Sequence, residues 1–126
     1  MSILAKAGIR VGVTEGGTSY HVLPQKLQSA TLLAAKTIDG AIAMLTKKEI
    51  DAYATNKAIL YEMAEKLSGS KVLDGRWGLE HFAIGIPKGR DSGRAFIQAF
   101  SEDIVATGFV KAAVGRAGLR GSAETQ

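Results

Sequence analysis

The sequence contains no cysteine, and only two of its 126 residues are proline. The absence of cysteine excludes a disulfide framework, thiolate metal sites and thiol catalysis. No apolar run reaches the roughly 20 residues of a membrane-spanning helix, and we expect no secretory signal in the first six residues, which are soon charged. Hydrophobic residues make up 46% and charged residues 22%, so a disordered chain is excluded as well.

Charged residues are not concentrated in any one segment, although the net charge is +4 at pH 7. Residues 1–89 hold eleven basic and eight acidic side chains, and residues 90–126 hold five and four. Only Lys47 and Lys48 are adjacent basic residues. Because a nucleic-acid groove needs a basic stripe interleaved with aromatic side chains, we predict no nucleic-acid partner.

Apolar residues alternate between strand spacing and helix spacing along the first two thirds of the chain. Period-two runs and short apolar runs predict strands, and stripes three or four residues apart predict the helices between them. Strands that alternate with helices indicate a mostly parallel sheet with helices on both faces, a three-layer α/β fold. The predicted strands are 9–14, 31–35, 50–54, 72–73 and 82–86, and the predicted helices are 18–29, 38–45 and 59–67.

Cap residues mark where several of these helices begin and end. Thr18 or Ser19 can cap the first helix through its side-chain oxygen, and Thr37 can cap the second. Pro24 lies inside the first helix, so we expect a kink or a restart there. Gly69 follows the third helix, at a position where a left-handed C-cap belongs.

The chain from residue 90 onward has the pattern of helices alone. Phe96, Phe100 and Ile104 lie four residues apart on one helical face, and Gly108 is expected to end that helix before a second short one. We therefore expect two parts, an α/β lobe over residues 1–89 and a C-terminal helical segment over residues 90–126.

Two segments fall at the carboxyl ends of predicted strands, the edge where open parallel sheets bind ligands. In the first, Gly16 and Gly17 let backbone N–H groups approach a ligand, while the hydroxyls of Thr18 and Ser19 stand at a helix N-terminus, which favours anions. The second is Thr55-Asn56, whose amide offers a donor and an acceptor. An ordinary glycine turn and simple N-capping explain the same residues without a ligand.

The residues do not assemble a recognisable catalytic, metal or nucleotide site. Neither G-x-x-x-x-G-K-[ST] nor G-x-G-x-x-G occurs, so no nucleotide cofactor is indicated. His21 and His81 are the only histidines, and they lack the spacing of metal ligands. Ser19 and His21 are too near in sequence to count as a nucleophile and its base on sequence alone. We predict a protein without catalytic activity, metal or cofactor.

Four stretches carry a family resemblance through their order and spacing. They are residues 11–19 (VGVTEGGTS), 49–56 (EIDAYATN), 82–89 (FAIGIPKG) and the closing pattern Phe96…Ala106-Thr107-Gly108-Phe109-Val110…Gly118. Together they resemble the second half of the family 3 extracellular solute-binding proteins, the receptors of polar amino acid ABC transporters. The resemblance covers the chain from about Gly8 to Gly118.

The resemblance implies one α/β lobe of a two-lobed receptor that closes on its ligand, with the helices that return to the other lobe. Gly17, Thr18 and Ser19 would supply N–H and hydroxyl groups to the ligand's α-carboxylate. Family members typically carry Asp at the position of Asn56, where it pairs with the α-ammonium, and an asparagine cannot supply that charge. The implied ligand is an amino acid or a related small carboxylate.

The resemblance also implies a periplasmic location and an ABC permease as partner. The resemblance does not extend to the first lobe, with the arginine that usually completes the carboxylate clamp, and we expect no signal peptide, so a cytoplasmic location stays open for the chain as written. Half a site buries a ligand on one side only, so we expect weak binding.

The apolar residues of the C-terminal helices would pack partly on the missing lobe, and they need another cover. We therefore predict a homodimer built on these helices, by exchange or by face-to-face packing, with a monomer whose helices fold back on their own sheet as the alternative. Two alternatives to the receptor lobe stay open. One is a flavodoxin-like phosphate-binding domain, regulatory or enzymatic, that uses the Gly16–Ser19 turn, and the other is a structural assembly unit with no remaining ligand.

Overall fold

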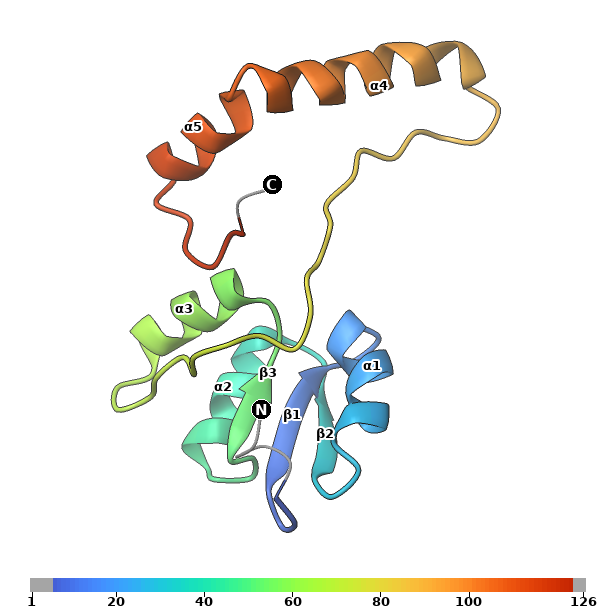
Figure 1. Cartoon of the computed structure of the whole chain (residues 1–126). Helices are drawn as coiled ribbons and strands as arrows, with labels where there is room; N and C mark the ends of the chain where they lie inside the picture. The colour runs from blue at the N-terminus through green and yellow to red at the C-terminus, as the bar shows by residue number, and fades with distance from the viewer. Residues whose placement is uncertain (1–5, 124–126) are drawn as a thin grey trace. The chain divides into compact units, whose positions relative to one another are not determined.

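The computed structural model describes residues 6–123 and divides the chain into two compact units between Gly78 and Leu79. The first unit contains a sheet and three helices, and the second contains two helices (Figure 1). Within the described residues, no helix is long and apolar enough to cross a membrane.

Three parallel strands form the sheet of the first unit, in the order β2-β1-β3. The strands are β1 (Arg10–Thr14), β2 (Thr31–Ala35) and β3 (Ala52–Ala54). Each strand is followed by a helix: α1 (Thr18–Lys26), α2 (Ile38–Thr46) and α3 (Lys57–Lys66). The predicted α/β fold class with a parallel sheet is confirmed, although the sheet is small.

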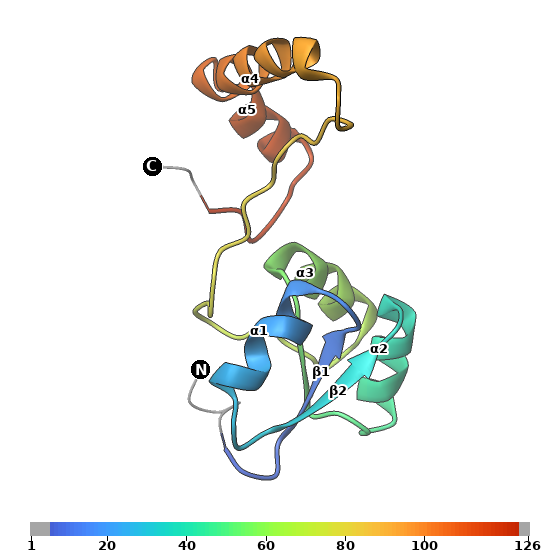
Figure 2. The ribbon, with the colours of Figure 1, turned by 90° about the vertical axis from the view of Figure 1, so that its right-hand side faces the viewer.

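Helices cover both faces of this sheet (Figure 1, Figure 2). Side chains along a strand point to opposite faces in turn, and Val11 and Val13 point toward α1, where they pack with Leu23 and Leu27. The other face packs against α2 and α3 in a second cluster, which contains Ala35, Ala41, Ile50, Tyr53 and Met63. The first unit thus has three layers with a core on each side of the sheet.

Cap residues fix several element boundaries as predicted. Thr37 is the N-cap of α2, and its Oγ1 accepts a hydrogen bond from the Gly40 N–H at 3.0 Å. Gly69 has the expected left-handed conformation, with a φ of +80°, but it lies two residues after Leu67, which is the C-cap of α3 in place of the predicted glycine. Such a φ is strained for residues with a side chain, which explains why glycine occupies this position.

The first helix differs from its prediction at both ends. Gly17 is its N-cap and no side chain caps the helix, so the predicted capping by Thr18 or Ser19 is wrong; both residues lie within the first turn. α1 continues through Pro24 and ends at Lys26, earlier than predicted. Pro24 has no N–H to donate within the helix, which weakens the turn that contains it.

The strands predicted at 72–73 and 82–86 are wrong, because the structure gives both segments no regular secondary structure. Phe82, in the longer segment, has 92% of its surface exposed. An apolar run becomes a strand only when another backbone pairs with its N–H and C=O groups. Within residues 6–123, no strand pairs with either segment.

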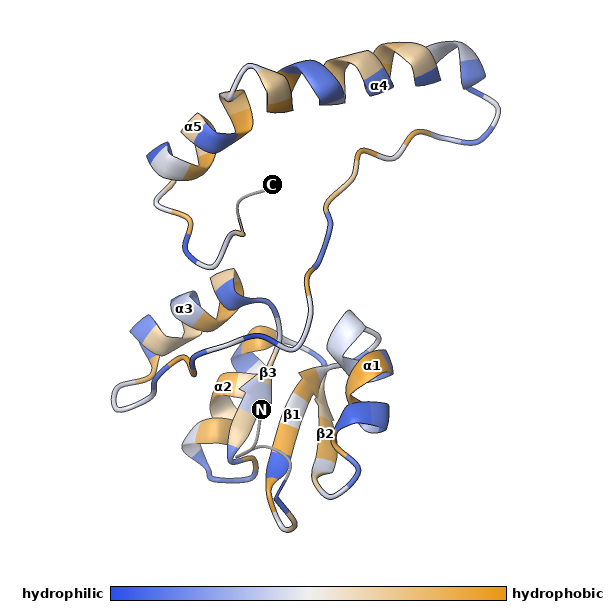
Figure 3. Ribbon diagram, viewed as in Figure 1, coloured by the Kyte–Doolittle hydropathy of each residue, from blue (hydrophilic) through white to orange (hydrophobic). Residues whose placement is uncertain are grey.

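The second unit consists of α4 (Asp91–Ala106) and α5 (Phe109–Arg116). Gly108 separates them with a φ of +73°, which confirms the predicted break at this residue. Apolar residues lie along both helices (Figure 3), yet none of the described residues from 79 onward is buried. The second unit therefore has no hydrophobic core of its own.

Candidate functional site

The sheet order identifies the edge where a ligand is best placed. The chain leaves β1 toward α1 on one face of the sheet, and the crossover from β2 to β3 runs through α2 on the other face. In open parallel sheets, ligands bind beyond the carboxyl ends of the strands at such a reversal. Val13 stands opposite Ala54, so the segments that follow β1 and β3 leave the sheet at this same edge.

The turn after β1 is held by two backbone hydrogen bonds. The Glu15 N–H donates to the Ala35 carbonyl at 2.9 Å, and the Gly17 N–H donates to the Thr14 carbonyl at 3.1 Å. Gly16 has a φ of +70° and is exposed. A Cβ on Gly17 would lie 3.3 Å from the Thr14 carbonyl oxygen, so the backbone here approaches β1 closely.

The N-terminus of α1 is the one helix start in the first unit that has no side-chain cap among the described residues. Thr37 caps α2 and Asn56 caps α3, whereas no side-chain oxygen accepts a hydrogen bond from the first turn of α1. The first N–H groups of a helix lack helical acceptors, and together they carry a partial positive charge. Thr18 is exposed beside them, and Ser19 is buried with 5% of its surface accessible.

The segment after β3 contributes the other predicted pair of residues. Thr55 and Asn56 are both half-buried, and the Asn56 Oδ1 accepts a hydrogen bond from the Ile59 N–H at 3.1 Å. The simple interpretation of Asn56 as an N-cap is therefore confirmed. Because its oxygen is used by α3, Asn56 has its amide N–H groups left to offer to a ligand.

Sequence reasoning missed a pair of hydroxyls at this edge. The Thr14 Oγ1 and the Tyr53 hydroxyl lie 2.6 Å apart and share one hydrogen bond, although Thr14 ends β1 and Tyr53 belongs to β3. Tyr53 is buried and its ring lies beside Gly12. Two hydroxyls hold two donor hydrogens and use one between them, which leaves one for another acceptor. The sequence signal that could have pointed to this pair is the alternation of side chains in β3. In the sheet, Tyr53 pairs with Gly12 of β1.

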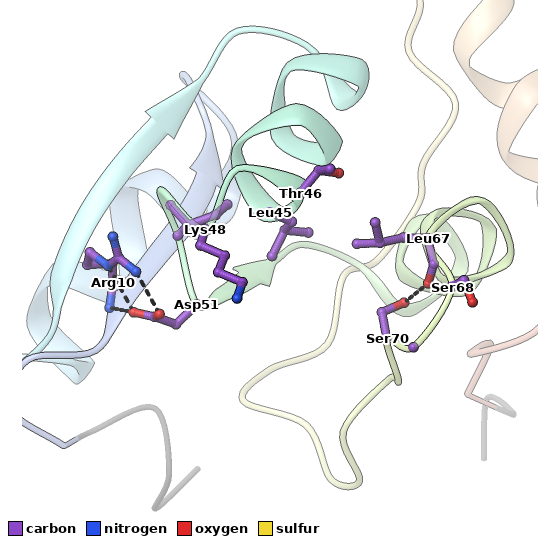
Figure 4. A pocket seen from close by; sticks show the side chains of 10 residues that line it. Arg10, Leu45, Thr46, Lys48, Asp51, Leu67, Ser68 and Ser70 are labelled. Carbon is purple, nitrogen blue, oxygen red and sulfur yellow. Dashed lines mark hydrogen bonds and ion pairs between the residues drawn. The ribbon is translucent and has the colours of Figure 1, made fainter.

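A pocket of about 590 Å³ lies at the opposite, amino-terminal edge of the sheet (Figure 4). Arg10 and Asp51 face each other there: the guanidinium donates to both carboxylate oxygens at 2.8 and 3.0 Å, and the Arg10 backbone N–H adds a third bond at 2.8 Å. These bonds, the guanidinium first, lower the pKa of Asp51 to about 2. The lining of this pocket includes none of the six residues predicted to bind the ligand.

The histidines lie apart from any cluster of metal-binding side chains. His21 and His81 are both exposed, and His21 stacks edge-on against Tyr20 with ring centroids 5.2 Å apart. The described part of the chain contains no group of three or more His, Cys, Asp or Glu residues arranged to hold a metal ion. The carboxyl edge therefore offers hydrogen-bond donors as its principal chemistry.

No family model matches the chain, and the comparisons with curated proteins and with solved structures gave no match. The chain is an α/β protein with a small parallel sheet and with hydrogen-bond donors in the segments that follow β1 and β3. The likeness to the solute-binding receptors rests on the sequence stretches quoted above.

Proposed function

We propose that the protein is a solute-binding module that resembles one lobe of an ABC transporter receptor and takes a small carboxylate or an amino-acid-like ligand. The observation that carries the proposal is the uncapped N-terminus of α1 at the carboxyl edge of the sheet, where Gly17 starts the helix. Backbone N–H groups at such a position form a site for a negatively charged group.

Every polar group that the proposal assigns to the site can donate a hydrogen bond. The first turn of α1 supplies backbone N–H groups and the Thr18 hydroxyl, and the segment after β3 supplies the Thr55 hydroxyl and the Asn56 amide. A carboxylate is an acceptor only, so this set is chemically matched to it. Gly16 and Gly17 have no side chains that would keep a ligand from the backbone.

The module is proposed to bind without catalysis. Turnover needs a base, a nucleophile and an oxyanion donor within reach of one another. The nearest candidates for a nucleophile and a base do not meet: His21 is exposed, and no hydrogen bond links it to Ser19 within the described residues. As in the receptors that it resembles, its partner would be an ABC permease, and its place would be the periplasm.

The proposal is tested by mapping amide chemical shifts while acetate, single amino acids, dicarboxylates and inorganic phosphate are added in turn. We expect shifts at residues 16–19 and at the side-chain amide of Asn56, with carboxylates acting more strongly than phosphate. A stronger response to phosphate would favour a flavodoxin-like phosphate domain. Shifts confined to the pocket around Arg10 and Asp51, or no shifts at all, would contradict the proposal.

A single substitution separates ligand binding from stability. Thr18→Asp places a negative charge in the first turn of α1, where it repels a carboxylate but suits the helix dipole. We expect ligand affinity to fall at least about fivefold while the free energy of unfolding rises by about 0.3–1 kcal/mol. Ser92→Asp in the first turn of α4 is the matched control, and it should leave affinity unchanged.

A further inference from the structure

The second unit exposes large apolar side chains on two adjacent helices. Phe96 and Phe100 of α4 are 71% and 45% exposed, and their rings stack with centroids 6.5 Å apart. Phe109 and Val110 of α5 are 58% and 39% exposed. We refer to these four residues as the α4–α5 surface. It belongs to a unit in which none of the described residues is buried.

Two helices of this length cannot cover such a surface by themselves. α4 has 16 residues and α5 has 8, and isolated helices of about 12–15 residues or fewer are marginal in water. Two helices side by side have no interior, whereas four helices enclose a core between them. The helices therefore need apolar packing from outside their own unit.

We propose that the α4–α5 surface is an interface between two copies of the chain, in which α4 of each copy packs against α5 of the other. This proposal is independent of the ligand site, because it rests on the second unit alone. The charges of the two helices and the area of the exposed apolar side chains both favour a second copy of the chain as the partner.

The net charges of α4 and α5 are opposite in sign. α4 carries three acidic side chains (Asp91, Glu102, Asp103) and one basic side chain (Arg94), a net charge of −2. α5 carries two basic side chains (Lys111, Arg116) and no acidic one, a net charge of +2. In a two-fold dimer the same contact occurs twice, so α4 on α5 brings opposite charges together at both places.

The apolar area is compatible with the size of a specific interface. One aromatic side chain presents about 150–250 Å², so the exposed parts of the three phenylalanines and Val110 supply roughly 400 Å² per copy. Two copies would bury about 800 Å² of apolar area, and because apolar atoms make up roughly 65% of such an interface, the total would be about 1,200 Å², within the range of specific interfaces. Arg116, whose guanidinium lies 6.0 Å from the centroid of the Phe109 ring, would stand at that rim.

The mass of the full-length chain in solution, measured over a range of concentrations by light scattering and sedimentation equilibrium, tests the proposal. The mass should rise with concentration toward twice the 13.3 kDa of one chain. A mass that stays at 13.3 kDa throughout the range overturns the proposal, as does a larger assembly that does not close at two copies.

A charge exchange tests the pairing itself without removing apolar side chains. In one variant Glu102 and Asp103 both become Lys, and in the other Lys111 and Arg116 both become Glu. Each variant alone should dimerise at least about tenfold more weakly, whereas an equimolar mixture should restore dimers, because only the mixed pair places opposite charges together at both contacts. Lys36→Glu with Lys71→Glu in the first unit is the matched control and should leave dimerisation unchanged.

Each outcome of the charge exchange has one interpretation. Circular dichroism first establishes that both variants keep the helix content of the parent chain. Folded variants that do not recover dimers on mixing overturn the pairing of α4 with α5. Variants that dimerise as tightly as the parent chain also overturn it, because the exchanged charges would then lie outside the dimer interface.

Discussion

Gly12 lies in the middle of β1, and the side chains of Ile50 and Tyr53 fill the space that a side chain at this position would need. A Cβ on Gly12 would lie 2.5 Å from the Ile50 Cδ1 and 2.9 Å from the Tyr53 Cδ2. Ile50 and Tyr53 are both buried in the cluster that α2 and α3 cover. The Tyr53 ring in turn supports the hydroxyl that meets Thr14 at the carboxyl edge. The absence of a side chain at Gly12 therefore lets the Tyr53 ring pack in the core with its hydroxyl at the candidate site.

Gly12→Ala should lower the free energy of unfolding by about 1–3 kcal/mol, because the added methyl group overpacks the core. Urea denaturation measures the loss. Gly78→Ala is the matched control, because a Cβ there meets nothing within 4 Å and Gly78 has no positive φ. It should change stability by less than about 0.5 kcal/mol. Equal effects of the two substitutions would contradict this account of the core.

Asp51 should give the first unit a pH dependence that is confined to acid. Its carboxylate is bonded to Arg10, which lowers its pKa from 3.8 to about 2. A carboxyl group with a lowered pKa stabilises the folded state above its unfolded pKa, and that contribution is lost as the pH falls toward the folded value. The stability difference between the parent chain and Asp51→Asn should therefore be constant from pH 7 to about 5 and shrink between about pH 4 and pH 2.

Denaturant titrations of both proteins at each pH measure this difference, and an NMR titration of the Asp51 carboxyl carbon measures its pKa directly. A midpoint close to 3.8 would show that the Arg10 contact does not hold the carboxylate in solution. Because the two side chains are 40% and 38% exposed, added salt should weaken the effect.

At the scale of elements, the three helices of the first unit begin in different ways, and the difference concerns function. α2 and α3 satisfy an N–H group of their first turn with a side chain of their own, Thr37 or Asn56. α1 begins at Gly17, whose lack of a side chain leaves the first turn open. A capped helix start supports stability, whereas an open one at a sheet edge has donors to offer to a ligand.

Asn56 serves both purposes in our account, and two substitutions separate them. Asn56→Ala removes the cap of α3 and should lower the free energy of unfolding by about 1 kcal/mol, measured by urea denaturation. Asn56→Asp keeps an oxygen for the Ile59 N–H, so stability should hold or rise. It also adds a carboxylate, so affinity for amino acids should rise relative to that for acetate. A loss of stability in Asn56→Asp equal to that in Asn56→Ala would contradict the capping role.

At the scale of the whole molecule, the two units differ in how they are stabilised. Among residues 6–78, the first buries ten apolar side chains in two clusters on either side of its sheet. In the second, the described residues 79–123 bury none, and the α4–α5 surface stays exposed. The first unit has the core of an independent domain, and the second has apolar side chains that its own helices do not cover. For this reason we expect the oligomeric state to depend on the second unit.

The sequence alone determined the cap at Thr37 and the break at Gly108, because each depends on residues close together in the chain. Its apolar pattern also located β2 and, to within one residue, β1. It did not determine the fate of 82–86, since an apolar run needs a partner strand that local pattern does not reveal. The six predicted site residues came from spacing, and the tertiary structure decided what each does: it used the Asn56 oxygen as a cap and left the start of α1 open. Only the fold brought Thr14 and Tyr53 together, because they lie 39 residues apart in the sequence and meet only when β3 pairs with β1.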